Sequence, residues 1–462
     1  MSIELRDWLP GLLRFLLLAA VVHCLGGAKA QAADPESIEL KSSVAPGNVT
    51  KVEAVLEVGG NLSLKEKAEI KTLPTEVVAR FAYDEKVLEA DQVRRTARNY
   101  RQAEAKYIVN KQPTDAKLSD EHTLFLVRAT DAQPEMLCPT DPLTADELDL
   151  VQIPFNSLIV DQLLPGKTTN VGDSWAHSEQ LMSGLLNLDA VSQTTVVSTL
   201  GEVDAASARI EFKGAVQGAI GGIATEVEVT GRYKFDRKLG RVSWLAVLIK
   251  EKRSIGHVEP GLDVQARLQM TIQPTAEPTA LKAANLSELV NASTADALRV
   301  RYSSSDNLFA FDHDRRWHVM ADRNNILSLR LVDRGELVAQ CNVTSVVLPD
   351  ADKMPTLAQF QADIRRSLDK NFGQFTNVTE SENSFGHIVF RAEAIGTVEG
   401  LEITWIYYLV QDRHGRQTVF AFTCENPMLK RMADADEDMI ATLRFAPPPN
   451  TAAQPTPATN VK

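Results

Sequence analysis

Four long strand-like segments follow one another in the middle of this chain, and they constrain its fold more than any other feature. Apolar and polar residues alternate along them; in the second segment Val227 and Val229 alternate with Glu226 and Glu228. This period of two predicts antiparallel strands with one buried and one wet face. A strongly curved sheet of this kind needs its concave face filled by a helix, a second layer or an apolar ligand. The four segments, separated by Gly-rich or Pro-Gly turns, cover residues 208–217, 224–237, 240–253 and 262–274.

The chain before these segments is predicted to be mostly strand, with one or two helices. Residues 48–88 alternate as half-buried strands. Residues 91–106 break the alternation and place Arg94, Arg98 and Arg101 at helical spacing. We interpret them as the solvated face of a helix, with a basic docking face as the alternative. Two further helical segments are predicted at residues 143–151 and 178–188.

A second domain is predicted after a change in composition. Residues 275–298 are rich in Pro, Ala, Thr, Asn and Ser, which indicates a linker. Beyond them come short strands, a hairpin over Asp333-Arg334-Gly335, a helix whose capping box pairs Thr356 with Gln359, three more strands and a last helix that starts at Asn426. This order predicts an α+β domain with a sheet between helices.

The chain as a whole is therefore predicted to be α+β. An N-terminal curved antiparallel β-sheet domain at residues 33–274 is followed by a C-terminal α/β/α sandwich at residues 299–447. Residues 448–462, rich in Pro, Ala and Thr, cannot bury enough apolar surface to order themselves and are predicted to be a disordered tail.

Residues 1–32 have the pattern of an export signal. Arg6 and Arg14 precede an apolar run over residues 15–25, and Ala28-Lys29-Ala30 or Ala30-Gln31-Ala32 fits a cleavage site of small residues. We expect an exported protein, periplasmic or extracellular, with no transmembrane span in the mature chain. The alternatives are an uncleaved anchor and lipidation at Cys24.

Net charge and cysteine content exclude several classes of function. The formal charge of -12 would repel nucleic-acid phosphates, so no nucleic-acid partner is expected. Beyond the signal the cysteines are Cys138, Cys341 and Cys424, without a CxxC pair, which argues against a thiol redox enzyme and a structural zinc site. Cys341 and Cys424 fall on predicted strands, either bonded to each other or packed as two thiols.

The densest group of chemically capable side chains lies between Asp306 and Met320. Asp312, His313, Asp314 and His318 could supply metal ligands, but strand alternation would separate His313 from its neighbouring aspartates. We therefore predict no metal site and expect a polar turn at the surface, anchored by Trp317, that could contact a partner. The turn consists of Asp312, His313, Asp314, Arg315 and Arg316.

No catalytic motif in the sequence is complete. Gly172-Asp173-Ser174 resembles the serine block of one esterase class, but no late Asp-x-x-His follows. Ser367-Leu368-Asp369-Lys370 and Ser305-Asp306-Asn307 match two penicillin-recognising elements in reversed order and without the Lys-Thr-Gly strand. No catalytic residue and no cofactor are predicted.

The C-terminal region resembles the PsbP-like α/β/α sandwich family over residues 299–447. The resemblance rests on the Phe309–Trp317 stretch, the hairpin, the helix at Thr356, the Ile406–Tyr408 strand before a polar turn at Asp412–Arg416, and the closing helix. The family is mostly non-enzymatic and binds other proteins, so the resemblance implies a binding role and no catalytic residues. The N-terminal region resembles, in outline only, exported bacterial proteins of unknown function.

These observations favour an exported, non-catalytic protein that acts as a binding or assembly module in the cell envelope or extracellular space. The alternative function is that of a carrier of an apolar ligand or lipid in the N-terminal sheet, and the weaker alternative is a hydrolase. The sequence leaves open the partner, the ligand, the oligomeric state and the glycosylation of its Asn-x-Ser/Thr sites.

Overall fold

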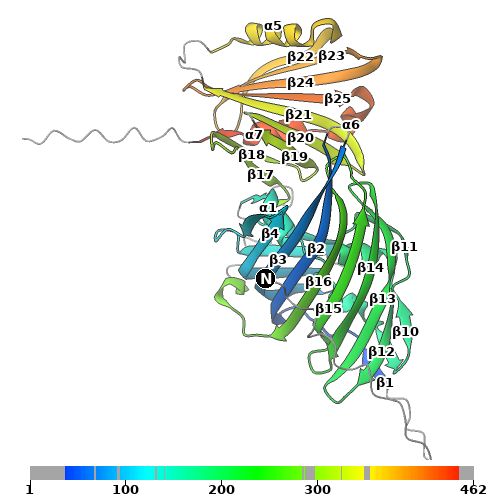
Figure 1. Ribbon diagram of the computed structural model, residues 1–462. Helices are drawn as coiled ribbons and strands as arrows, with labels where there is room; N and C mark the ends of the chain where they lie inside the picture. Colours follow the sequence, from blue (N-terminus) through cyan, green and yellow to red (C-terminus); the bar gives the residue numbers. More distant parts are fainter. Residues whose placement is uncertain are drawn as a thin grey trace, which may run out of the picture. The chain divides into compact units, whose positions relative to one another are not determined.

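The computed structural model describes residues 37–66, 69–90, 94–130, 133–139, 141–283, 286, 297–323, 325–347 and 354–446 (Figure 1). These residues form mainly β-strands in several antiparallel sheets, with few helices. The predicted export signal and the predicted Pro/Ala/Thr tail lie outside the described residues, as does most of the predicted linker. Among the helices of the described part, none combines the length and hydropathy needed to cross a membrane.

The first sheet has 13 strands in the described residues, and the predicted run of four strands forms its centre as β13 to β16. The order is β10-β12-β13-β14-β15-β16-β2-β3-β4-β6-β7, with β11 paired to β13 and β5 paired to β4. The sheet curves strongly (Figure 1). Its strands are β2 (Val49–Glu66), β3 (Glu69–Ala90), β4 (Arg94–Val109), β5 (Gln112–Lys117), β6 (Leu124–Thr130), β7 (Gln133–Leu137), β10 (Ser174–Ala176), β11 (Ala190–Thr194), β12 (Val197–Val203), β13 (Ser207–Ile220), β14 (Ile223–Asp236), β15 (Arg241–Arg253) and β16 (Gly261–Pro274).

Register in this sheet follows the alternation of the sequence. Strand β14 pairs with β13 without a shift from Ser207↔Asp236 to Ile220↔Ile223, and its residues alternate between exposed and buried. The joining turn uses Gly221 and Gly222, whose φ angles of 54° and 74° favour glycine. The last of the four central strands, β16, pairs with the first long strand, β2, so the sheet is continuous across a large separation in sequence.

Two short helices and the loop between them fill the buried face of the first sheet. Helix α1 (Ala145–Val151) begins with a capping box between Thr144 and Glu147, and α2 (Glu179–Leu186) is capped by Ser178. Both predicted helical segments are therefore confirmed. Phe155, from the loop between the helices, packs on Phe212 of β13 with ring centroids 5.7 Å apart. The chain's own residues thus form one continuous apolar core with the strands.

Two further sheets are formed mainly by residues after 299, but the smaller one also includes β8 (Leu143–Thr144), which pairs in parallel with β17 (Val300–Ser303). A sheet of seven strands has the order β19-β20-β21-β25-β24-β23-β22, and a sheet of four has the order β26-β18-β17-β8. A separate pair joins β1 (Ser37–Leu40) to β9 (Lys167–Asn170). The strands of the two sheets are β8 (Leu143–Thr144), β17 (Val300–Ser303), β18 (Phe309–His313), β19 (Trp317–Arg323), β20 (Ile326–Asp333), β21 (Glu336–Val347), β22 (Phe372–Glu382), β23 (Ile388–Val398), β24 (Leu401–Gln411), β25 (Arg416–Glu425) and β26 (Arg444–Phe445).

Apolar clusters pack helices against the seven-stranded sheet. Helix α5 (Leu357–Leu368) has the predicted capping box at Thr356 and buries Phe360, Ile364 and Leu368 in a cluster with β23 and β24. A second cluster joins α6 (Leu429–Met432) and α7 (Ala435–Thr442) to β18, β20, β21 and β25. Within it Trp317 is 2% exposed, which confirms its prediction as the anchor of the turn, and Phe311 is fully buried in the same cluster.

Two predictions of secondary structure are wrong. The last helix is not continuous, because Ala433 has a φ of 49° between α6 and α7. Residues 94–106 form strand β4 and not a helix. A spacing of four residues returns to the same face in a strand as well as in a helix, because four is a multiple of two. Arg94 and Arg98 therefore share a face of β4. The hydrogen-bonded pairing with β3 and β6 makes this segment a strand.

Candidate functional site

Arg98 is buried within the first sheet and not on a solvated face. Its side chain is 1% exposed, and its Nε donates to Glu85 Oε2 at 2.6 Å from the paired position on β3. Its Nη2 donates to Ser157 Oγ at 3.0 Å and also to the Asn156 side chain. The guanidinium lies 4.8 Å from the centre of the Tyr83 ring. Its Nη1 lies 3.9 Å from the sulfur of Met136. Every nitrogen of this buried cation thus has a partner, which is the condition for keeping a charge in a protein interior.

Glu85 is ionised by the same arrangement. Burial raises the pKa of its carboxyl, but the guanidiniums of Arg98 and Arg241 more than offset burial and hold the pKa below its usual value. Ser157 Oγ lies 3.0 Å from both carboxylate oxygens, and Thr96 donates to Oε2 at 3.2 Å. The carboxylate is therefore held by groups from two strands and a loop.

A second ion pair lies beside the first, between Arg241 at the start of β15 and Asp161 in the short 3-10 helix η1 (Val160–Leu163). Arg241 Nη2 is 3.3 Å from Asp161 Oδ2, and the backbone N–H of Val242 donates to Asp161 Oδ1 at 2.7 Å. Burial raises the pKa of Asp161, and Arg241 acts in the opposite direction. Arg241 Nη2 also donates to the carbonyl of Ser157 at 3.3 Å, which joins the two ion pairs into one ionic cluster.

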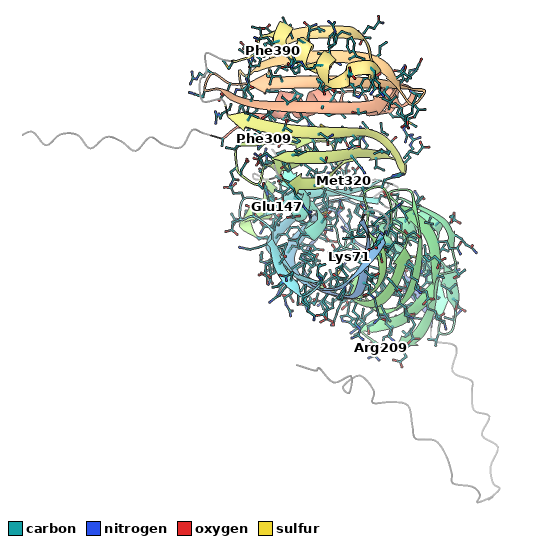
Figure 2. The ribbon with its side chains drawn as sticks, turned by 45° about the horizontal axis from the view of Figure 1, so that its top comes forward. Lys71, Glu147, Arg209, Phe309, Met320 and Phe390 are labelled. Carbon is teal, nitrogen blue, oxygen red and sulfur yellow. The ribbon has the colours of Figure 1, made fainter. Side chains whose placement is uncertain are left out.

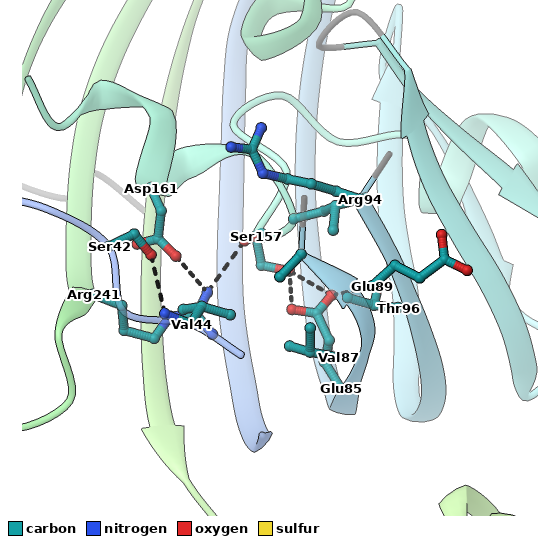
Figure 3. A pocket seen from close by; sticks show the side chains of 12 residues that line it. Ser42, Val44, Glu85, Val87, Glu89, Arg94, Thr96, Ser157, Asp161 and Arg241 are labelled. Atoms are coloured by element: carbon teal, nitrogen blue, oxygen red, sulfur yellow. Dashed lines mark hydrogen bonds and ion pairs between the residues drawn. The ribbon is translucent and has the colours of Figure 1, made fainter. Parts of the chain in front are cut away.

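A cavity of about 130 Å³ lies against this ionic cluster (Figure 3). Its lining includes five charged side chains and the hydroxyl of the ionic cluster: Glu85, Glu89, Arg94, Asp161, Arg241 and Ser157. Glu85 is fully buried whereas Glu89 is exposed, so the cavity extends from the core to solvent. We call it the ionic pocket.

Two donors that border the ionic pocket have no partner. Arg241 Nε is buried and makes no hydrogen bond. The half-buried Arg94 side chain makes no hydrogen bond or ion pair with any residue that the structure describes; burial lowers the pKa of its guanidinium, and the more distant Asp161 acts in the opposite direction. The pocket thus combines a satisfied ionic cluster with unused cationic donors.

The Asp312–Arg316 turn differs from its prediction as an exposed surface. Asp312 and His313 are 7% and 3% exposed. Asp312 accepts from Arg301 Nε at 2.8 Å, and His313 Nδ1 lies 2.8 Å from the carbonyl oxygen of Asp314. Arg315 Nη2 donates to the carbonyl of Met136 at 2.8 Å. Neighbouring parts of the same chain therefore use these polar groups, and an external partner for the turn stays a prediction.

The motifs compared with hydrolases occupy ordinary structural positions. Ser174 Oγ lies 2.8 Å from Thr199 Oγ1 on the neighbouring strand β12, and Asp173 Oδ2 accepts from the backbone of Asn170 in a turn. Ser367 is exposed on helix α5. A serine with no base in hydrogen-bond reach is not an activated nucleophile.

Cys341 and Cys424 are free, buried thiols on the paired strands β21 and β25. Cys341 lies opposite Phe422, and Cys424 lies opposite Ala339, so the two cysteines are diagonal and not directly paired. The disulfide that the sequence left open is not formed here.

Strand β22 is an edge strand that the sequence analysis did not predict. It ends the seven-stranded sheet, and most of its 11 residues are exposed. Two register shifts fall before Asn377, after which pairing with β23 is regular from Asn377↔Glu393 to Glu382↔Ile388. Figure 2 shows this sheet and the side chains around Phe390 of β23. The stretch 377–382, which we call the β22 edge, has no strand on its outer side among the described residues.

Comparison with known proteins assigns no family. No family model matches the chain, and no curated protein matches it. Among solved structures, the cyanobacterial PsbP protein of Synechocystis matches 32% of this chain and 94% of its own, at 13% identity and a TM-score of 0.27. The Pseudomonas aeruginosa protein PA94 matches 33% of this chain and 98% of its own, at 13% identity and a TM-score of 0.22. Lipovitellin matches 52% of this chain and 26% of its own, at 9% identity and a TM-score of 0.33.

The expected likeness to PsbP is thus found at low identity over about a third of the chain. The fold and the site define a broader class than a family: a strand-rich α+β protein with a buried ionic cluster in its first sheet.

Proposed function

We propose that this protein is an exported, non-catalytic binding module, and that it binds a partner protein at the β22 edge. The observation that carries the proposal is the exposed, regular stretch at the end of the seven-stranded sheet. An edge strand presents a row of backbone N–H and C=O groups, and an extended segment of another protein can add to it as a further strand.

The composition of the β22 edge supports a specific kind of partner. Glu380 and Glu382 are exposed and lie two residues apart, so their side chains are on one face of the strand. Opposite charges on neighbouring strands attract, and like charges repel. The partner strand is therefore expected to carry Lys or Arg on the same face.

The face of β22 that carries Glu380 and Glu382 also anchors the strand, because Val378 lies on that face two residues before Glu380. Phe372, Phe375 and Val378 pack into the apolar cluster beneath helix α5, and Arg365 of α5 lies over the rings of Phe372 and Phe375 at 5.1 and 5.6 Å. The edge is thus fixed in place before a partner arrives, which lowers the entropic cost of binding.

Site-specific photo-crosslinking tests the proposal. A photoreactive residue at Glu380 should give a defined adduct in the cells that make the protein, and the same residue at Glu228, exposed on β14, should not. Proline at Ser381 and at Glu382, with the photoreactive residue kept at Glu380, then separates edge binding from folding. Successive N–H groups point to opposite sides of a strand, so one variant removes an outward donor and the other an inward donor.

The expected result is that the outward variant loses the adduct at an unchanged melting temperature. Equal adducts at Glu380 and Glu228, or an adduct that survives both proline variants, would contradict strand addition at this edge.

The carrier of an apolar ligand stays a prediction without a specific observation in its favour. The buried face of the first sheet packs against residues from α1, the following loop and α2, and the ionic pocket beside them is bordered by charged groups.

A further inference from the structure

The charges around the ionic pocket do not balance. Arg98 pairs with Glu85, and Arg241 pairs with Asp161. Arg94 adds a third guanidinium with no partner of its own among the described residues. The pocket therefore has one cation in excess, and a partly buried cation is stabilised by an anion close to it.

Glu89 does not remove this excess. It borders the pocket, but its Oε1 accepts from Arg95 Nη1 at 2.9 Å. This ion pair is neutral as a whole, so it leaves the charge of Arg94 uncompensated.

The unused donors indicate the shape of the missing anion. Arg241 Nε is a buried donor with no acceptor, on a side chain that is 5% exposed. Arg94 brings a second planar guanidinium to the same cavity. Guanidinium groups fit the planar pair of oxygens in a carboxylate, with two parallel hydrogen bonds.

Size and charge limit the anion further. A cavity of about 130 Å³ is slightly smaller than the cavity of roughly 150 Å³ that holds benzene, so it accommodates about six non-hydrogen atoms. Glu85 and Asp161 also line the cavity and would repel a second negative charge. A monoanion thus fits better than a phosphate or sulfate dianion.

We propose that the ionic pocket binds a small monocarboxylate, of the size of acetate or lactate, whose oxygens accept hydrogen bonds from the Arg94 guanidinium and from Arg241 Nε. The site is independent of the β22 edge, so either proposal can fail alone. It would give the protein a small-molecule ligand in its first domain in addition to a protein partner in its second.

Ligand titration of the purified full chain tests the site. Acetate and L-lactate should bind in saturation-transfer NMR and raise the melting temperature, whereas acetamide should do neither, because it has the shape of acetate without the charge. Inorganic phosphate should bind more weakly than acetate.

Two variants make the test specific. Arg94→Gln should weaken acetate binding about tenfold, as expected for the loss of a charged hydrogen bond. Its melting temperature without ligand should change little, because Arg94 makes no hydrogen bond or ion pair with a described residue and interacts with Asp161 only at longer range. Arg80→Gln on β3, an exposed position, removes the same charge outside the pocket and should bind acetate as the wild type does.

Absence of acetate and lactate binding would overturn the proposal, as would equal binding of acetate and acetamide. Phosphate binding as tight as acetate binding would overturn the monocarboxylate class. An unchanged acetate affinity in Arg94→Gln would overturn the assignment of the site.

Discussion

Arg98 and Glu85 face each other across β4 and β3, with Nε donating to Oε2 at 2.6 Å and both side chains 1% exposed. The hydroxyls of Thr96 and Ser157 bond the carboxylate, and Asn156 and Ser157 bond the guanidinium. A pair so fully enclosed fixes the register of β3 and β4 against the loop that follows α1.

Removal of one partner should therefore be costly. Arg98→Met is expected to lower the free energy of unfolding by about 3–5 kcal/mol, because it leaves the Glu85 carboxylate buried without its cation. Denaturant unfolding of the full chain measures this loss. The double variant Glu85→Gln/Arg98→Met should recover part of it, and Arg80→Gln should change stability by less than about 0.5 kcal/mol. A double variant no more stable than Arg98→Met would contradict the explanation by an uncompensated charge.

His177 should make the protein less stable in mild acid. Burial lowers the pKa of its imidazole from 6.5 to about 4, and its Nε2 lies 2.7 Å from Ser198 Oγ. Between these two pH values the unfolded chain binds a proton that the folded chain does not, so stability falls as pH falls, by about 1.4 kcal/mol per pH unit.

Urea unfolding between pH 7 and pH 4 measures this dependence. His177→Gln should reduce the slope of unfolding free energy against pH by the contribution of one proton, about 1.4 kcal/mol per pH unit. The same change at the exposed His414 should leave this slope unaltered. A slope in His177→Gln equal to that of the wild type would show that other groups cause the loss.

Gly231 leaves room for an aromatic ring. A Cβ at this position would lie 2.4 Å from the Phe212 ring and 2.8 Å from the carbonyl oxygen of Ala246. Gly231→Ala should therefore destabilise the protein by about 1–3 kcal/mol through overpacking in the first sheet. Adding Phe212→Leu should restore part of the loss in thermal unfolding. Gly201→Ala, where the nearest atom is 3.5 Å away, serves as the control and should have little effect.

Cys341 and Cys424 should resist alkylation in the native protein. Burial raises the pKa of both thiols, that of Cys424 to about 11, and the thiolate is the reactive form. Iodoacetamide labelling followed by peptide mass spectrometry should find neither residue modified before unfolding and both modified in denaturant without a reductant. Labelling that requires a reductant would reveal a disulfide between them.

Elements with a strong local pattern could be predicted from the sequence. The alternation in β13 to β16 and the capping box at Thr356 are each contained within a few neighbouring residues, and both are confirmed. Strand β22 was missed because its polar, exposed sequence resembles a loop, and only pairing with β23 makes it a strand.

The ionic pocket could not be predicted in the same way. Its lining residues come from five separate segments, and Arg94 and Arg98 share a face in a strand as well as in a helix. Only the pairing of Arg98 with Glu85 reveals that these arginines point inward. Conversely, the Asp312–Arg316 turn looked like a functional site because its polar residues are adjacent in sequence, whereas the fold uses them for internal contacts.

The pairing of β2 with β16 joins Thr50 to Pro274, and this has a consequence for the order of folding. Strand β2 can form its hairpin with β3 early, but its other edge has to wait until β16 has been synthesised. Contacts over such a long loop form slowly, and an unpaired edge invites association with other chains. When only the first 260 residues have been synthesised, the sheet therefore exists as two halves that are not yet joined. The free edge of β2 can associate with other chains until β16 pairs with it.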